Sequence, residues 1–284
     1  MSAVPQAAAR LAGWLLAALT GTATAACGGH APAQPPPGVR MAASGFGFAV
    51  RGSGAPAVVF VSGLGDGRDA WTPVLPDVAA FTTAFAYDRA GYGHSPPAVG
   101  ARDGAAILAE LRGRLASAGL RPPYVLVGHS LGGMYVELYA RAYPKEVVGA
   151  VLVDPRTHDF GARCAAAFGA ATCAPPDSMV AGLPAPARAE LEGEPATSRE
   201  VAAAGPMPDI PLVVLTRTEA GGDTAIFRVW QASQRELAAS SRRGRQVLVP
   251  KTTHYIQRDA PAAVVAAIRE VVDSARVGGR AGSR

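Results

Sequence analysis

The residues whose types and spacing most clearly indicate catalytic chemistry lie in the run Gly128-His-Ser-Leu-Gly132, which has the spacing G-x-S-x-G. A serine on a very tight turn between a strand and a helix takes a strained backbone, and small residues two positions away avoid clashes there. The apolar run 124–127 precedes this motif, and a helical pattern follows it. Such a turn would hold the Ser130 hydroxyl at the positive end of the helix, where developing negative charge is stabilised. The pattern therefore predicts that Ser130 is a nucleophile.

A serine hydroxyl is a poor nucleophile at neutral pH and needs a base in contact with it. Among five histidines, His254 follows the last predicted strand, where the topology of a parallel sheet would bring its loop beside Ser130. His254 also gives the chain order Ser, acid, His. His129 occupies the variable position of the turn and is expected to face away. The others lie in a proline-rich segment, in a turn and at the start of an insertion: His30, His94 and His158. We predict that His254 is the base.

An acid must accept the second N–H of the imidazole, fix its tautomer and stabilise the imidazolium. Asp154 ends the strand after the Ser130 helix and is the first candidate, although an Asp-Pro pair can also be only a turn. Asp223 and Glu219 follow the next predicted strand and are the alternatives. The sequence leaves the choice among these three carboxylates open.

An ester-cleaving site also needs two backbone N–H groups that converge on the developing oxyanion. Leu131, the residue after the nucleophile, is expected to supply one, and Leu64 in the glycine-rich turn 63–67 the other. That turn lacks the lysine and the spacing of a nucleotide-binding loop. We predict neither a cofactor nor a metal.

Strands and helices alternate from about Met41 onward, which predicts a mostly parallel central sheet with helices on both faces. The alternation stops over 156–208, a segment rich in Ala, Pro and charged residues, which we interpret as a short inserted lid. The core then comprises 41–155 and 209–275. The lid acids are expected on a solvated face: Glu190, Glu192, Glu194 and Glu200. The predicted strands are 57–62, 83–87, 123–127, 147–153, 211–216 and 246–249.

The N-terminal segment 1–26 has a basic start, a short apolar run and small residues before Cys27, the pattern of an export signal. The apolar run is shorter than the about 20 residues that a membrane-spanning helix needs. Cys27 stands where bacterial lipoproteins carry an acylated cysteine, so membrane anchoring through a lipid on Cys27 is the alternative to free secretion. Residues 27–40 are predicted to form a proline-rich tether, and 276–284 a flexible tail. We expect a protein that is secreted or lipid-anchored at the outer face of a bacterial membrane.

Cysteine use and charge bound the remaining possibilities. Export would place Cys164 and Cys173 in an oxidising compartment, where two cysteines so close in sequence are expected to form a disulfide. The formal net charge of +5 raises the question of nucleic acid, but the basic residues form no stripe interleaved with aromatics. We therefore expect no nucleic-acid partner, and the oligomeric state stays open.

Several segments together resemble the α/β-hydrolase superfamily, specifically its single-domain, esterase-like branch. They are YDRAGYGHS (87–95), PYVLVGHSLGG (123–133), VLVDP (151–155) and HYIQ (254–257). The resemblance covers about residues 46–273 and implies the α/β-hydrolase fold with a triad built on Ser130 and His254. It also implies that Asp88 and Arg89 hold the loop beside the site. The chain departs from the family pattern at Ser62, where His is common, and at Thr253, where Gly is common.

The resemblance also implies a reaction class. Serine at position 130 disfavours dehalogenase and epoxide-hydrolase chemistry, which in this superfamily resembles cases with Asp at that position. We expect hydrolysis of a small-molecule carboxylic ester with a small to medium apolar acyl group, through an acyl-enzyme intermediate. The alternatives are an aminopeptidase or amidase, an acyltransferase on the same triad, or a ligand-binding protein with slow turnover.

Overall fold

The computed structural model describes residues 40–41 and 47–281. Its centre is an eight-stranded sheet in the order β1-β2-β4-β3-β5-β6-β7-β8, in which β2 runs antiparallel to both neighbours and the other pairs are parallel. The predicted α/β class with a mostly parallel sheet is confirmed. The strands are β1 (Arg40–Met41), β2 (Gly47–Arg51), β3 (Ala57–Val61), β4 (Ala84–Tyr87), β5 (Tyr124–His129), β6 (Val147–Val153), β7 (Leu212–Arg217) and β8 (Gly244–Val249).

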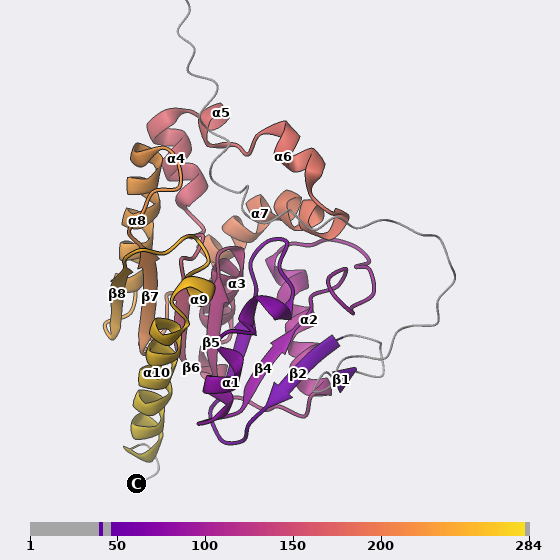
Figure 1. The fold of residues 1–284 in the computed structure, drawn as a ribbon, viewed down its shortest axis with the longest axis vertical. Coiled ribbons are helices and arrows are strands. Elements are labelled where there is room, and N and C mark those ends of the chain that lie inside the picture. The colour runs from indigo at the N-terminus through magenta and orange to yellow at the C-terminus, as the bar shows by residue number, and fades with distance from the viewer. Residues whose placement is uncertain (1–39, 42–46, 282–284) are drawn as a thin grey trace, which may run out of the picture.

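Helices cover both faces of this sheet (Figure 1). One face packs against α2 (Gly104–Ser117), α3 (Leu131–Ala142) and α8 (Thr224–Ala239), and the other against η2 (Arg68–Trp71), α1 (Leu75–Ala79) and α10 (Pro261–Ala281). Two short helices complete the core, η3 (Pro144–Glu146) and α9 (Ile256–Asp259). The result is a three-layer arrangement in which both faces of the central strands are buried.

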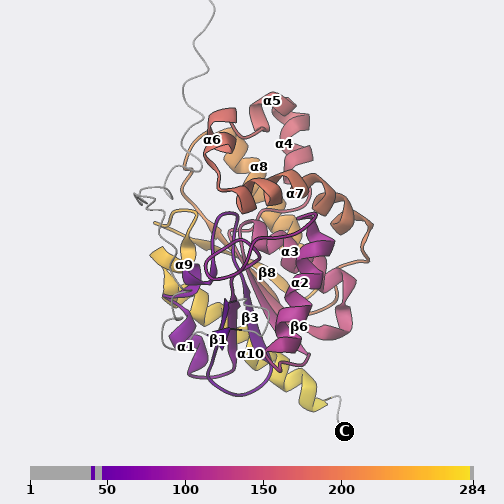
Figure 2. The same ribbon diagram turned by 90° about the vertical axis from the view of Figure 1, so that its right-hand side faces the viewer.

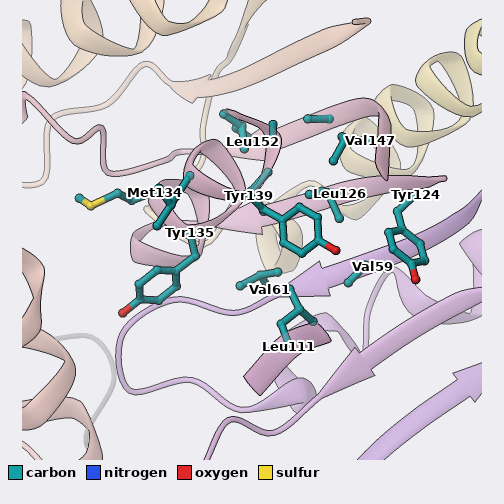
Figure 3. Close-up of a cluster of buried hydrophobic side chains, with 14 of the residues drawn as sticks. Val59, Val61, Leu111, Tyr124, Leu126, Met134, Tyr135, Tyr139, Val147 and Leu152 are labelled. Atoms are coloured by element: carbon teal, nitrogen blue, oxygen red, sulfur yellow. The ribbon is translucent and has the colours of Figure 1, made fainter. Parts of the chain in front are cut away.

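The central strands, whose ends carry the candidate site, pack closely against α2 and α3. Figure 3 shows Val61 and Leu126 of the sheet with Leu111 of α2 and with Tyr135 and Tyr139 of α3 around one apolar cluster. All five side chains are at most 1% exposed. Burying an aliphatic side chain of this size contributes about 1.5–3 kcal/mol. The strand ends that carry the candidate site therefore stand on a rigid base.

The insertion forms four helices above the edge at which the parallel strands end (Figures 1 and 2). They are α4 (Phe160–Phe168), α5 (Ala170–Cys173), α6 (Asp177–Gly182) and α7 (Ala185–Ala203). A disulfide between Cys164 and Cys173 joins α4 to α5. Helix α7 packs against α2 and α3, so the insertion is anchored on the core along one side.

Both chain ends bear on the sequence predictions. The predicted signal 1–26, Cys27 and the tether up to residue 39 lie outside the described residues, and export and lipidation stay predictions. Helix α10 continues to Ala281, so the predicted flexible tail was wrong over 276–281. Arg276 explains the longer helix, because it donates to the main-chain carbonyls of Ala55 and Phe81. Within the described ranges, no helix is both long enough and apolar enough to span a bilayer.

Candidate active site

Ser130 occupies a strained turn between β5 and α3. Its φ of 51° and ψ of −123° place a non-glycine residue in a rarely populated region, at a cost of about 1–3 kcal/mol. A Cβ at Gly128 would lie 2.6 Å from the carbonyl oxygen of Gly132, and one at Gly132 would lie 2.2 Å from that of Val61. Larger residues at either position would therefore clash with backbone. The motif glycines are required by the close approach of β3, β5 and α3.

His254 and Asp154 meet at the same edge of the sheet. Asp154 follows β6 directly and His254 lies in the loop after β8, and His254 Nδ1 is 2.7 Å from Asp154 Oδ2. The Asp154 side chain is fully buried, and its main-chain N–H donates to the carbonyl of Leu215 on β7. A carboxylate can only accept, so Nδ1 carries the proton and Nε2 is left as an acceptor. This is the tautomer that a general base requires.

The two alternative acids have other partners. Asp223 caps the N-terminus of α8 by accepting from the main-chain N–H groups of Ala225 and Ile226. Glu219 accepts from the N–H groups of Lys251 and Thr252, in the loop that leads to His254. Asp154 is thus the carboxylate that the structure brings to the imidazole, while Glu219 braces the loop that carries it.

Besides His254, three donors surround the Asp154 carboxylate. Oδ1 accepts from Trp230 Nε1 at 2.9 Å and from Gln234 Nε2 at 3.0 Å, and Arg217 Nε lies 3.0 Å from Oδ2. Burial alone would raise the pKa of Asp154, but the hydrogen bond to His254 and the charge of Arg217 help to outweigh it, and the pKa is lowered below its usual value. Asp154 is therefore ionised at neutral pH.

The His254 imidazole is held neutral. Its side chain is 19% exposed, and this burial lowers the pKa of the imidazole. The contact with Asp154 raises the pKa, whereas the neighbouring His129 and Arg217 lower it further. The net result is a pKa below the usual value for histidine. A neutral imidazole can take a proton from a hydroxyl, which a charged one cannot.

His129 was expected to face away from the site, and this expectation was wrong. Its ring lies 4.7 Å from the His254 ring, and its Nε2 is 3.0 Å from the His254 main-chain carbonyl, to which it must donate. His129 directly precedes Ser130, so this bond connects the Ser130 turn to the loop that carries His254. In the described part of the chain, the Ser130 hydroxyl and the His254 ring form no direct hydrogen bond, and such contacts often tighten only when substrate binds.

The glycine-rich turn 63–67 lies against Ser130. A Cβ added at Gly63 would be 3.1 Å from Ser130 Cβ, which places the peptide between Gly63 and Leu64 beside the serine. Leu131 is the first residue of α3, where main-chain N–H groups have no partner within the helix. The structure thus brings the glycine-rich turn that contains Leu64 beside Ser130, while Leu131 directly follows Ser130 in the chain.

The prediction that the lid acids form a solvated face was wrong for three of the four. Glu190 is fully buried and pairs with Arg89, Glu194 pairs with Arg156, and Glu200 accepts from the N–H of Ala105. Only the exposed Glu192 fits the prediction. One face of α7 packs against α2 and α3 of the core, and a carboxylate buried on that face needs a cation or an N–H donor to compensate for its lost hydration. Among the described residues, no group of three or more His, Cys, Asp or Glu side chains could hold a metal ion.

A family model, curated relatives and solved structures are similar to this chain. A family model described as "Alpha/beta hydrolase family" matches residues 58–267. The chain is 28% identical to protein YqjL of Bacillus subtilis over 229 residues, which cover 78% of this chain and 85% of that protein. A shorter match, to YbdG of the same organism, is 33% identical and covers 36% of this chain and 32% of that protein. Among solved structures, a thermophilic esterase from Thermogutta terrifontis aligns with a TM-score of 0.56 at 20% identity, over 84% of this chain and 98% of that one.

Proposed function

The chain belongs to the α/β-hydrolase family, and on that premise we propose that it is a serine hydrolase that cleaves carboxylic esters of small to medium apolar acyl groups. The observation that carries the proposal is the 2.7 Å contact between His254 Nδ1 and the Asp154 carboxylate, beside the strained turn of Ser130. It sets the neutral tautomer that activates a serine. The structural likeness to an esterase supports the fold that this reaction would use.

The reaction runs in two stages. The Ser130 hydroxyl attacks the ester carbonyl carbon while His254 Nε2 takes its proton, and the oxyanion accepts from the N–H groups of Leu131 and Leu64. The imidazolium, stabilised by Asp154, then gives its proton to the leaving alcohol, and the acyl group stays on Ser130. A water molecule then attacks the acyl carbon while His254 takes its proton. The acyl–oxygen bond to Ser130 breaks as the imidazolium returns that proton to the serine oxygen, which releases the carboxylic acid and restores the free serine and the neutral imidazole.

The preference for an apolar acyl group is inferred from the aromatic surroundings of the base. Trp230 lies edge-on to the His254 ring at 5.9 Å, and Phe160 of the lid lies edge-on to Trp230 at 4.9 Å. Phe160 and Trp230 belong to one apolar cluster that joins α4 to α8. Phe160 and Trp230 are each 7% exposed, so the surroundings of the base are already largely shielded from water. A charged substituent brought beside them would lose its hydration without a partner, whereas an apolar one would not.

Covalent labelling combined with a turnover assay tests the proposal. A fluorophosphonate should add one phosphonyl group to the protein, peptide mapping should place it on Ser130, and p-nitrophenyl butyrate should be turned over many times. Labelling elsewhere would contradict the assignment of the nucleophile. Acylation by the butyrate ester without turnover would favour the ligand-binding alternative, and faster cleavage of amino-acid β-naphthylamides would favour the peptidase alternative.

Replacing Arg217 should move the acidic limb of the pH profile. Activity needs neutral His254, and the Arg217 cation disfavours the imidazolium, so Arg217→Gln should raise the pKa of His254. The midpoint of the acidic limb of kcat/KM should then lie at higher pH than in the wild type. Arg245→Gln, which removes an exposed ion pair with Glu270, is the control and should leave the profile unchanged. An unchanged or lower midpoint for Arg217→Gln would contradict the assignment.

A further inference from the structure

The buried guanidinium of Arg89 forms two hydrogen bonds to the turn that carries Leu64, the second predicted oxyanion donor. Its Nη1 donates to the carbonyl of Ser62 at 2.6 Å, and its Nη2 donates to the carbonyl of Gly63 at 2.7 Å. The Arg89 side chain is 1% exposed. Hydrogen bonds from a charged donor that is shielded from solvent are among the stronger ones in proteins. Arg89 therefore fixes two successive peptide carbonyls of the turn.

The second of these carbonyls belongs to the same peptide unit as the Leu64 N–H. A trans peptide is planar, and its C=O and N–H point in opposite directions. When Arg89 holds the Gly63 carbonyl on one side, the Leu64 N–H must point to the other. A cation on the carbonyl also polarises the peptide and strengthens its N–H as a donor. The direction of the predicted oxyanion donor thus depends on where the guanidinium sits.

Glu190 of the lid helix α7 sets the position of that guanidinium. Its Oε1 accepts from Arg89 Nε at 2.7 Å, and its Oε2 accepts from Arg89 Nη2 at 2.8 Å. The same Oε2 accepts from the Tyr92 hydroxyl at 2.9 Å, and Tyr92 in turn accepts from the N–H of Gly65 at 3.4 Å. The Glu190 carboxylate thus binds both side chains that contact the peptides around Leu64. Arg89 contacts the carbonyl of Gly63, and Tyr92 contacts the N–H of Gly65.

We propose that Glu190 is a positioning residue through which the lid aims the Leu64 N–H at the oxyanion. This inference rests on the proposed serine hydrolysis. It gives α7 a role beyond covering the site, because a buried lid carboxylate is connected to the turn by two parallel links, one through Arg89 and one through Tyr92. Movement of α7 away from the core would release both links together. The oxyanion site would then be complete only while α7 is seated.

The first test compares Glu190→Gln with the wild type on p-nitrophenyl butyrate. A neutral amide cannot hold Arg89 by charge, so the turn should lose its fixed direction and kcat should fall about 10–100-fold, less than the 10²–10³-fold loss of a removed oxyanion donor. KM should change little, because the donor acts on the oxyanion. Affinity for a trifluoromethyl ketone, which forms an oxyanion on Ser130, should weaken by the same factor as kcat. Glu192→Gln removes an exposed carboxylate from the same helix and should match the wild type in all three quantities.

A double variant separates positioning from mere stability. Glu190→Gln leaves a buried cation with a weakened partner and should lower the melting temperature. Adding Arg89→Met removes that cation, so part of the stability should return while kcat and ketone affinity stay low. Recovery of activity together with stability would overturn the proposal, as would a folded Glu190→Gln variant with wild-type kcat and ketone affinity. A wild-type protein that neither labels on Ser130 nor hydrolyses the ester would instead refute the proposed function.

Discussion

Asp154→Asn is expected to lower kcat for ester hydrolysis by about four orders of magnitude, with little change in KM. Oδ1 accepts from the indole of Trp230 and from Gln234, and Gln234 is fixed because it also donates to the Pro155 carbonyl and accepts from the Thr216 hydroxyl. The two donors at the Oδ1 position outweigh the single Arg217 N–H beside Oδ2, so we expect the amide oxygen of Asn to take the Oδ1 position and its NH₂ to face His254. That arrangement forces Nδ1 to accept, so Nε2 carries the proton and cannot take one from Ser130.

The alternative acids supply matched controls, measured on the same p-nitrophenyl ester. Asp223→Asn keeps a side chain that caps a helix as well as Asp does, and its kcat should stay within about two-fold of wild type. Glu219→Gln weakens the acceptor of two N–H groups in the loop before His254 and should produce a smaller loss than Asp154→Asn. A loss for Asp223→Asn as large as that for Asp154→Asn would overturn the assignment of the acid.

The parts of this fold that sequence predicts are those set by local rules. The run 57–61 is buried along its whole length in β3, and the spacing of glycines around Ser130 follows from contacts of the turn with its own neighbours. His254 could be placed because carboxyl ends of parallel strands share one edge. The same rule put all three acid candidates at that edge but left the choice among them open. These inferences need only periodicity, turn chemistry and the handedness of a parallel sheet.

The parts that sequence did not supply depend on partners far along the chain. Strand β2, absent from the predicted strands, is short and pairs antiparallel with β4, so nothing in 47–51 alone indicates it. Glu190 lies 101 positions after Arg89, and its spacing in α7 does not reveal that it meets a buried cation. The packing of His129 on His254 spans 125 positions. A buried arginine needs a buried carboxylate as its partner, so Arg89 is the signal in the sequence that one of the α7 acids is buried.

Ser130→Ala should reduce kcat by about six orders of magnitude while leaving the fold intact. The substitution deletes the hydroxyl that forms the acyl-enzyme and keeps the Cβ that the strained turn already accommodates, and this hydroxyl has no hydrogen bond to lose among the described residues. Stability should therefore stay within about 0.5 kcal/mol of wild type by denaturant unfolding. Any residual rate would come from water attacking an ester held by the Leu131 and Leu64 N–H groups.

The measurement for this last variant must exclude contaminating esterases, since a trace of another enzyme can mimic residual activity. Ser117→Ala, on an exposed turn of α2, passes through the same purification and should keep full activity. The Ser130→Ala protein should also bind the trifluoromethyl ketone far more weakly, because no hemiketal can form, while a simple ester should still bind reversibly. Equal rates for Ser130→Ala and wild type would mean that the hydroxyl at the turn takes no part in the chemistry. The contact between His254 and Asp154 would then require another explanation.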